Sequence, residues 1–170
     1  GLSTASLPVA TAQVQNPQQR ACILAFNKAA AKLAKAQVRT LTDCGRQRLE
    51  AGGNAVGCLT TDPQGRVRAA RARLADTAAN KCAVAPDFGK GETSAAIAAA
   101  AGEALGMIST LYVYTGGLPD PTEAAESDCY SQMNRYAEKL LVAKLKAFYA
   151  CAHDGVFGGA ITSSAGLASC

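Results

Sequence analysis

The sequence lacks tryptophan, and aromatic residues of all kinds make up only 5% of its 170 residues. Alanine, leucine and valine must therefore fill the core, and such small side chains require helices to approach one another closely. No CxxCH segment is present, which excludes covalent c-type haem by pattern. A single histidine leaves a zinc or copper site short of ligands. We expect no cofactor and no metal.

Signatures of nucleotide binding and ester hydrolysis are also missing. The chain has no GxGxxG or GxxxxGK[ST] segment for phosphates and no GxSxG segment for a serine nucleophile. The one histidine, His153, stands beside Asp154, and we expect adjacent side chains on one helix to point apart. At the end of a helix His153 suits a structural role, complementing the helix dipole. We predict that the protein is not an enzyme.

Cysteine, by contrast, is abundant: the chain has seven, many for a reduced protein of this size. Their wide spacing, without any CxxC, favours disulfides over metal ligation. Disulfides of this kind form in oxidising compartments. We therefore expect an extracytoplasmic protein, in the periplasm, on the cell surface or secreted.

Two stretches of the chain repeat one pattern. Cys22 and Cys44 are 22 residues apart, as are Cys129 and Cys151. A shift of 107 positions also places identical residues on Asn27, Ala30, Lys32, Leu33 and Ala36. Such a duplication dictates the architecture. It predicts an all-α helical bundle of two related disulfide-stapled αα-hairpins joined by an Ala-rich helix.

Prolines and glycines that interrupt helices divide the chain into four parts. We expect an extended N-terminal arm at 1–15, mobile or docked on a partner, and a first helical hairpin at 16–86. An Ala-rich bridging segment follows at 87–119, and a second, apparently incomplete hairpin at 120–170.

Each helix of the first hairpin has a predicted start signal. Asn16-Pro17 is an N-cap followed by proline at the first helical position, and this helix should run to about Ala51, before Gly52-Gly53. By the same logic Asp62-Pro63 opens a second helix that runs to about Cys82. The first helix carries apolar residues on one side and lysines on the other.

Helix geometry predicts how the cysteines of this hairpin pair. Twenty-two helical residues turn through about six full turns, so Cys22 and Cys44 share a face about 33 Å apart and cannot bond each other. The second helix is about 30 Å long. In an antiparallel pair, Cys44 then meets Cys58 near the turn, and Cys22 meets Cys82 at the open end. The crossed pairing fits these lengths poorly.

The middle of the chain, 94–115, is almost uncharged. We expect an Ala-rich helix from about Thr93 to Tyr112, buried between the two hairpins. The alternative is a membrane span over 94–115, but alanine and glycine drive insertion weakly, and Glu103 lies near its centre, where a charge is costly.

The last helix begins with the strongest local signal in the chain. Asp120-Pro121 provides a cap and a first-turn proline, Glu123 is placed for a capping box, and the helix should stop at Gly155. The repeat pairs Cys151 with Cys170 and leaves Cys129 unmatched. Three explanations remain open, in this order: the natural polypeptide continues past Cys170 to a closing cysteine, Cys129 bonds another chain, or it is a free thiol.

Several segments resemble a group of uncharacterised exported bacterial proteins built of cysteine-stapled helical hairpin repeats. They are AFNKAAAKLAKAQ after Cys22, CLTTDPQGRVRAA from Cys58, KC at 81–82 and PDFG at 86–89. The resemblance covers about residues 20–90 closely and 125–170 loosely. It implies export and a helical repeat, and it implies no activity.

Charge is distributed unevenly. Residues 17–85 hold 12 Lys and Arg against 4 Asp and Glu, a net of +8, whereas the rest holds 5 against 9, a net of −4. The halves can attract each other within one molecule or between copies. The best candidate for binding an anionic partner is a basic face: Lys28, Lys32, Lys35, Arg39, Arg66, Arg68, Arg71 and Arg73.

Within that basic face, Arg66 and Arg73 share one side of their helix, and Arg68 and Arg71 share another. A solvated helical surface is the alternative reading. An acidic protein, lipopolysaccharide or anionic lipid suits such a face. Nucleic acid fits poorly, because no aromatic residue is interleaved with the charges and export separates the protein from it.

From these features we expect a non-enzymatic structural or accessory subunit of a bacterial cell-envelope or extracellular assembly, acting through contacts with other subunits or copies of itself. The unmatched Cys129, the N-terminal arm and the charge asymmetry all suit association. The alternative is a secreted binding module whose basic hairpin captures an anionic ligand or surface. An enzyme or cofactor carrier using His153 is a third hypothesis.

Overall fold

A computed structural model describes residues 14–51, 58, 61–114 and 124–170, without the side chains of 49, 107–109, 111–114 and 124–127. These residues contain no strand and form five helices packed as a bundle. The helices are α1 (Pro17–Glu50), α2 (Arg66–Lys81), α3 (Thr93–Tyr114), α4 (Ala124–Phe157) and α5 (Ser164–Ala168).

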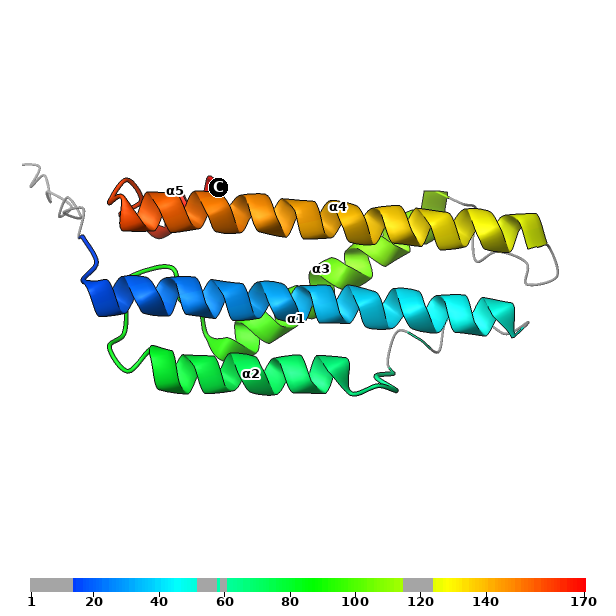
Figure 1. Ribbon diagram of the computed structural model, residues 1–170, viewed down its shortest axis with the longest axis horizontal. Coiled ribbons are helices and arrows are strands. Elements are labelled where there is room, and N and C mark those ends of the chain that lie inside the picture. Colours follow the sequence, from blue (N-terminus) through cyan, green and yellow to red (C-terminus); the bar gives the residue numbers. More distant parts are fainter. Residues whose placement is uncertain (1–13, 52–57, 59–60, 115–123) are drawn as a thin grey trace, which may run out of the picture.

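Helix α1 is the centre of the bundle, because α2, α3 and α4 all pack against it. Figure 1 shows α2 and α4 on opposite sides of α1, both antiparallel to it, while α3 crosses obliquely behind. The long helices α1 and α4 have the same length, 34 residues each.

The main core lies between α1 and α2. Phe26 and Leu33 of α1 are almost fully buried and pack in one cluster with Val67 and Leu74 of α2. Ala100 of α3 closes this cluster from the back. Partly buried alanines surround it, and their small side chains let the three helices come close.

Two smaller clusters attach α4 to α1. At one end, Ile23 of α1 meets Phe88, Ala152 and Val156, and Leu167 of α5 completes the group. Further along, a second cluster contains the following residues of α1, α3 and α4: Val38, Leu41, Ala104 and Leu141. Contact with α1 therefore runs along much of α4.

Three disulfides bond six of the seven cysteines, and Cys129 is free and exposed. The bonds are Cys22–Cys82, Cys44–Cys58 and Cys151–Cys170, the same pairs that helix lengths and the repeat predict. Cys22–Cys82 joins α1 to the residue that follows α2. The disulfides favour an oxidising, extracytoplasmic setting.

The start of α1 agrees with the predicted cap. Asn16 Oδ1 accepts a hydrogen bond from the Gln19 backbone N–H at 2.9 Å, and Gln19 Oε1 accepts one from the Asn16 N–H at 2.9 Å. This reciprocal pair is a capping box. Just before it, buried Gln15 exchanges two hydrogen bonds with Asp87, so the end of the N-terminal arm is docked on the chain itself.

The predicted start of α2 at Asp62-Pro63 is wrong. The helix begins at Arg66, after a turn closed by the hydrogen bond from Gly65 N–H to the Asp62 carbonyl at 3.0 Å. Gly65 has a φ of 65°, which glycine adopts without strain. Asp62 still caps the helix, but from the turn: its Oδ2 accepts from the Arg68 N–H at 2.9 Å.

The predicted stop of α4 at Gly155 is also wrong, because the helix continues to Phe157. A Cβ at Gly155 would lie 2.4 Å from Ile161 Cδ1, so any larger residue there would have to displace the Ile161 side chain. The left-handed turn falls instead at Gly159, whose φ is 74°. In a sequence, a glycine at a site of close packing cannot be told from a glycine at a left-handed turn.

Burial of α3 between two hairpins is not observed. Ala100 and Ala104 are buried, but Leu105 is 36% exposed and Glu103 lies in solvent. The reason is that α1 and α4 pack directly on each other, so α3 is confined to the outside of the bundle. The helix itself covers 93–114, close to its predicted span.

Several predicted features lie outside the described residues. These are the arm at 1–13, the helix end at Gly52-Gly53, the end of the bridging segment at 115–119 and the cap at Asp120-Pro121 with Glu123.

The repeat offers a matched pair of core and surface leucines. Leu33 is 1% exposed, whereas Leu140, its counterpart 107 residues later, is 58% exposed. We expect Leu33→Ala to lower the free energy of unfolding by about 2–5 kcal/mol, because it leaves a cavity. Leu140→Ala should change it by less than about 0.5 kcal/mol. Urea unfolding followed by circular dichroism measures both, and equal losses would contradict the packing described.

The two disulfides of the α1–α2 pair should differ in strength. Cys22–Cys82 closes a separation of 60 residues and Cys44–Cys58 one of 14. Chain entropy then predicts about 4 kcal/mol for the first and about 3 kcal/mol for the second. We expect replacement of both cysteines by alanine to cost more at the first pair, as measured by urea unfolding. The reverse order would show that loop closure does not govern their contribution.

Candidate functional site

A groove with a volume of about 1030 Å³ runs along α1 and α2. One rim comes from α1, where Lys28, Lys32, Lys35 and Arg39 recur at intervals of four, three and four residues and so share a face. The other rim comes from α2, where Arg66, Arg73 and Lys81 recur at seven and eight residues.

Alanines form the floor of this groove. Ala25, Ala29 and Ala36 lie on the α1 side, and Ala69 and Ala70 on the α2 side. Because a methyl group fills little space, the two helices pack closely at their cores yet leave a channel along their outer edges. The same alanines that let the two helices approach each other closely therefore also leave space for the groove.

The groove is strongly cationic. Seven Lys and Arg and three Asp and Glu side chains line it, which leaves a net charge of +4. Neighbouring charges of one sign in a channel with low-dielectric walls attract counter-charges. The arrangement suits attraction of an extended anionic partner.

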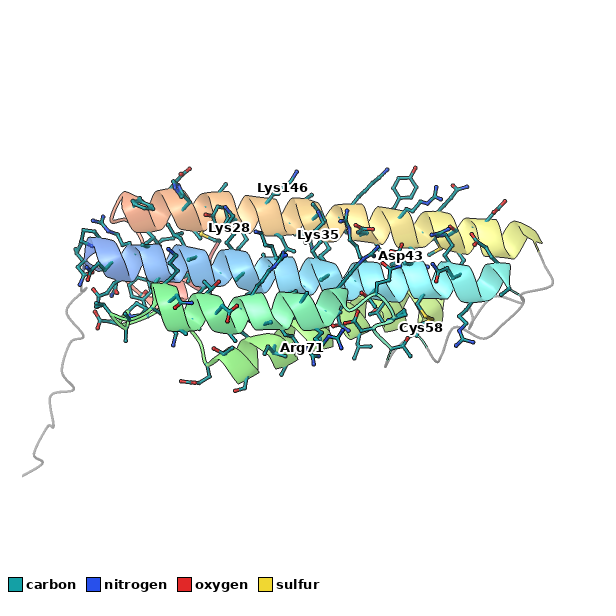
Figure 2. All side chains as sticks on the ribbon, turned by 60° about the horizontal axis from the view of Figure 1, so that its bottom comes forward. Lys28, Lys35, Asp43, Cys58, Arg71 and Lys146 are labelled. Carbon is teal, nitrogen blue, oxygen red and sulfur yellow. A yellow bond between two sulfur atoms is a disulfide. The ribbon has the colours of Figure 1, made fainter. Side chains whose placement is uncertain are left out.

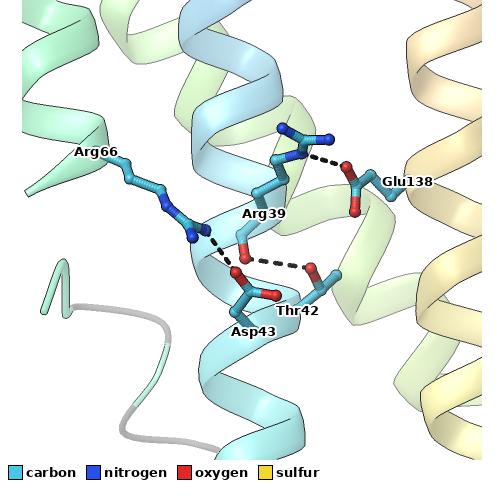
Figure 3. Close-up of polar contacts among 5 residues, drawn as sticks. All are labelled: Arg39, Thr42, Asp43, Arg66 and Glu138. Carbon is cyan, nitrogen blue, oxygen red and sulfur yellow. Dashed lines mark hydrogen bonds and ion pairs between the residues drawn. The ribbon is translucent and has the colours of Figure 1, made fainter. Parts of the chain in front are cut away.

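Two ion pairs cross between helices at one end of the groove. Arg66 of α2 pairs with Asp43 of α1, and Arg39 of α1 pairs with Glu138 of α4 (Figure 3). Thr42 donates to the backbone carbonyl of Arg39 at 3.2 Å, beside these pairs. The arginine side chains remain 50% and 41% exposed, so each pair contributes only about 0–1 kcal/mol. A bound anion can therefore replace either carboxylate at small cost.

Four of the predicted cations that line the groove form no ion pair with a carboxylate among the described residues, and Lys28 is one of them. The other three are Lys32, Lys35 and Arg73. Lys28 lies 5.7 Å from the ring centroid of Tyr149 on α4, a cation–π distance. These groups offer positive charge that the protein does not itself neutralise.

The predicted basic face is only partly brought together. Six of its eight residues line the groove, whereas Arg68 and Arg71 do not. Figure 2 shows Lys28 and Lys35 along α1, with Arg71 on the edge of α2 that faces away. This division follows from helical spacing, which places Arg66 and Arg73 on one side of α2 and Arg68 and Arg71 on another.

Sequence reasoning missed one cation and all three acids of the groove. Lys81 continues the spacing of Arg66 and Arg73, so the sequence alone could have placed it on the same face of α2. Asp43 and Asp76 have no comparable signal. Glu138 depends on the packing of α4 against α1, which no local pattern reveals.

Beside this groove a second hollow of about 280 Å³ lies between α1 and α4. Lys35 and Arg39 line it from α1, and Lys139 and Lys146 from α4, with Glu138 among them. The basic surface thus continues from α2 across α1 onto α4.

His153 is placed differently from the prediction. Its Nδ1 lies 3.0 Å from Asp154 Oδ1, so the adjacent side chains meet instead of pointing apart. Both are exposed, and the imidazole also contacts the Phe157 ring at a centroid distance of 4.9 Å.

Two kinds of feature are absent from the described residues. No three His, Cys, Asp or Glu side chains among them lie together as metal ligands would. None of the helices within the described ranges combines the length and apolarity of a membrane-crossing segment.

Fold and groove together define an all-α, disulfide-bonded helical protein with a basic surface channel. Comparison with known protein families, curated proteins and solved structures finds no match to this chain. The resemblance to exported repeat proteins therefore stays a prediction.

Proposed function

We propose that this protein is a non-enzymatic accessory subunit of a bacterial cell-envelope or extracellular assembly, and that it binds an acidic segment of a protein partner in the α1–α2 groove. The observation that carries the proposal is the gathering of seven cations around one alanine-floored channel. No cofactor takes part. We interpret α1–α2 and α4–α5 as two related hairpins, a scaffold for contacts.

The shape of the groove favours a linear partner. From Lys28 to Arg39 the α1 rim extends about 16 Å, or three helical turns. A segment with small residues toward the alanine floor and carboxylates toward both rims would match it, as amphipathic helices match grooves elsewhere. Charge complementarity would raise the association rate and exclude basic competitors.

A second candidate is capture of an anionic surface or polymer. It is favoured by Lys32, Lys35 and Lys81, which have no ion pair among the described residues and lie on an open channel. Capture of a surface or polymer requires positive charge, but it requires less exact shape complementarity than binding of one peptide segment.

The groove can be tested against a control with the same change of charge. Lys32→Glu/Lys35→Glu alters the groove, and Arg68→Glu/Arg71→Glu alters the outer face of α2, each by the same four charges. We expect the groove variant to weaken binding of a poly-glutamate peptide at least about tenfold, and the control variant much less. Isothermal titration calorimetry at low and moderate salt measures both.

Equal weakening by the two variants would show that net charge alone governs binding and would remove the groove from the proposal. Sedimentation with phosphatidylglycerol vesicles tests the second candidate in parallel. Groove-dependent binding to vesicles but not to poly-glutamate would replace the protein partner with an anionic surface.

A further inference from the structure

Helix α4 carries an apolar stripe that no described element covers. Its members alternate at intervals of four and three residues, the spacing of a coiled-coil seam: Cys129, Met133, Tyr136, Leu140, Ala143 and Ala147. Tyr136 is 66% and Leu140 58% exposed. The stripe is turned away from α1, because the residues of α4 that pack on the core, such as Leu141 and Ala152, belong to a different face.

The corresponding stripe on α1 is buried. Moving back 107 positions, Cys129, Tyr136 and Leu140 become Cys22, Ala29 and Leu33. These three are 0%, 9% and 1% exposed, because α2 lies over them. The same face of the repeat thus carries a docked helix on α1, whereas none of the described helices covers it on α4.

The cysteines at the start of the two stripes differ in the same way as the stripes themselves. Cys22 bonds Cys82, one residue beyond the end of the covering helix α2. Cys129 is exposed and free, and the other six cysteines are already bonded to one another. A cysteine that bonds Cys129 must therefore come from outside these 170 residues.

The charged residues on either side of the stripe indicate which charge a helix that covers the stripe would carry. Lys139, Lys144 and Lys146 lie exposed on either side of it, while Glu138 is engaged by Arg39. A second copy of this chain would bring the same lysines against them, and a helix like α2 would bring arginines. Acidic flanks complement this surface.

We propose that the α4 stripe is the docking surface for an amphipathic helix of another polypeptide, with apolar residues at 3–4 spacing, acidic flanks and a cysteine that bonds Cys129. The bond forms when the two thiols give up two protons and two electrons to a disulfide oxidant of the extracytoplasmic compartment. This surface lies apart from the α1–α2 groove and does not depend on what the groove binds.

Two designed peptides test the surface on the 170-residue protein. Both share one Leu/Ala seam and a terminal cysteine held as a mixed disulfide with thionitrobenzoate, but one has glutamate flanks and the other lysine flanks. The Cys129 thiolate attacks the peptide sulfur and releases coloured thionitrobenzoate. At low salt we expect the glutamate peptide to react at least about tenfold faster, since steering favours opposite charge. Equal rates would overturn the proposed charge complementarity.

Substitutions separate docking from simple thiol exposure. Leu140→Asp should remove most of the rate advantage, whereas Leu105→Asp, at another exposed leucine on α3, should leave it unchanged. Circular dichroism checks that both variants fold. If the two variants behave alike, or if the protein alone forms a Cys129–Cys129 dimer faster than it reacts with the glutamate peptide, the stripe does not dock such a helix.

The source of the helix is settled by mapping, without reduction, the peptide bonded to Cys129 in the protein isolated from its native host. We expect a peptide of a different polypeptide, with seam and acidic flanks as described. A peptide contiguous with this chain, Cys129 of a second copy, or a free thiol would each overturn the proposal. Since the groove variants leave α4 unchanged, failure here and failure of the proposed groove are distinguishable.

Discussion

Close packing of α1 against α2, fixed by two disulfides, is the constraint on which the rest of the structure depends. Both helices are cationic on their outer faces, so their approach is opposed by repulsion as well as by chain entropy. Phe26, Leu33, Val67 and Leu74 supply the apolar contact, and Cys22–Cys82 limits the freedom of the unfolded chain. With few aromatic residues available, such covalent links take on part of the stabilisation that a larger core gives elsewhere.

The groove is a consequence of that packing. Alanine at the interface brings two rows of cations alongside each other, and the disulfides keep them there although the charges repel. The protein neutralises only part of this charge, through Asp43 and Glu138. A preformed, partly unneutralised channel loses little entropy when an anionic segment enters it, which is the physical basis for the binding role that we propose.

Much of the fold was predictable because the repeat and the helix lengths are strong, long-range constraints. Cysteine pairing follows from a rigid rise per residue, and the Asn16 cap follows from local chemistry. The start of α2 was not predictable, because a proline after an aspartate opens a turn as readily as a helix. Likewise the exposure of α3 depends on α1 and α4 meeting directly. Six of the eight predicted cations came together because helical periodicity fixes a face, whereas Glu138 entered from a distant helix that no spacing rule connects to it.

Nuclear magnetic resonance of the uniformly labelled protein, titrated with a poly-glutamate peptide, tests the central claim most directly. If the groove is the binding site, backbone amide shifts will move along 28–39 of α1 and at the groove-facing positions of α2 near Arg66, Arg73 and Lys81. The amides around Arg71 and along the outer side of α4 will stay in place. Shifts spread evenly over every basic surface, with Arg68 and Arg71 as affected as Lys32 and Lys35, would contradict a groove that selects its partner.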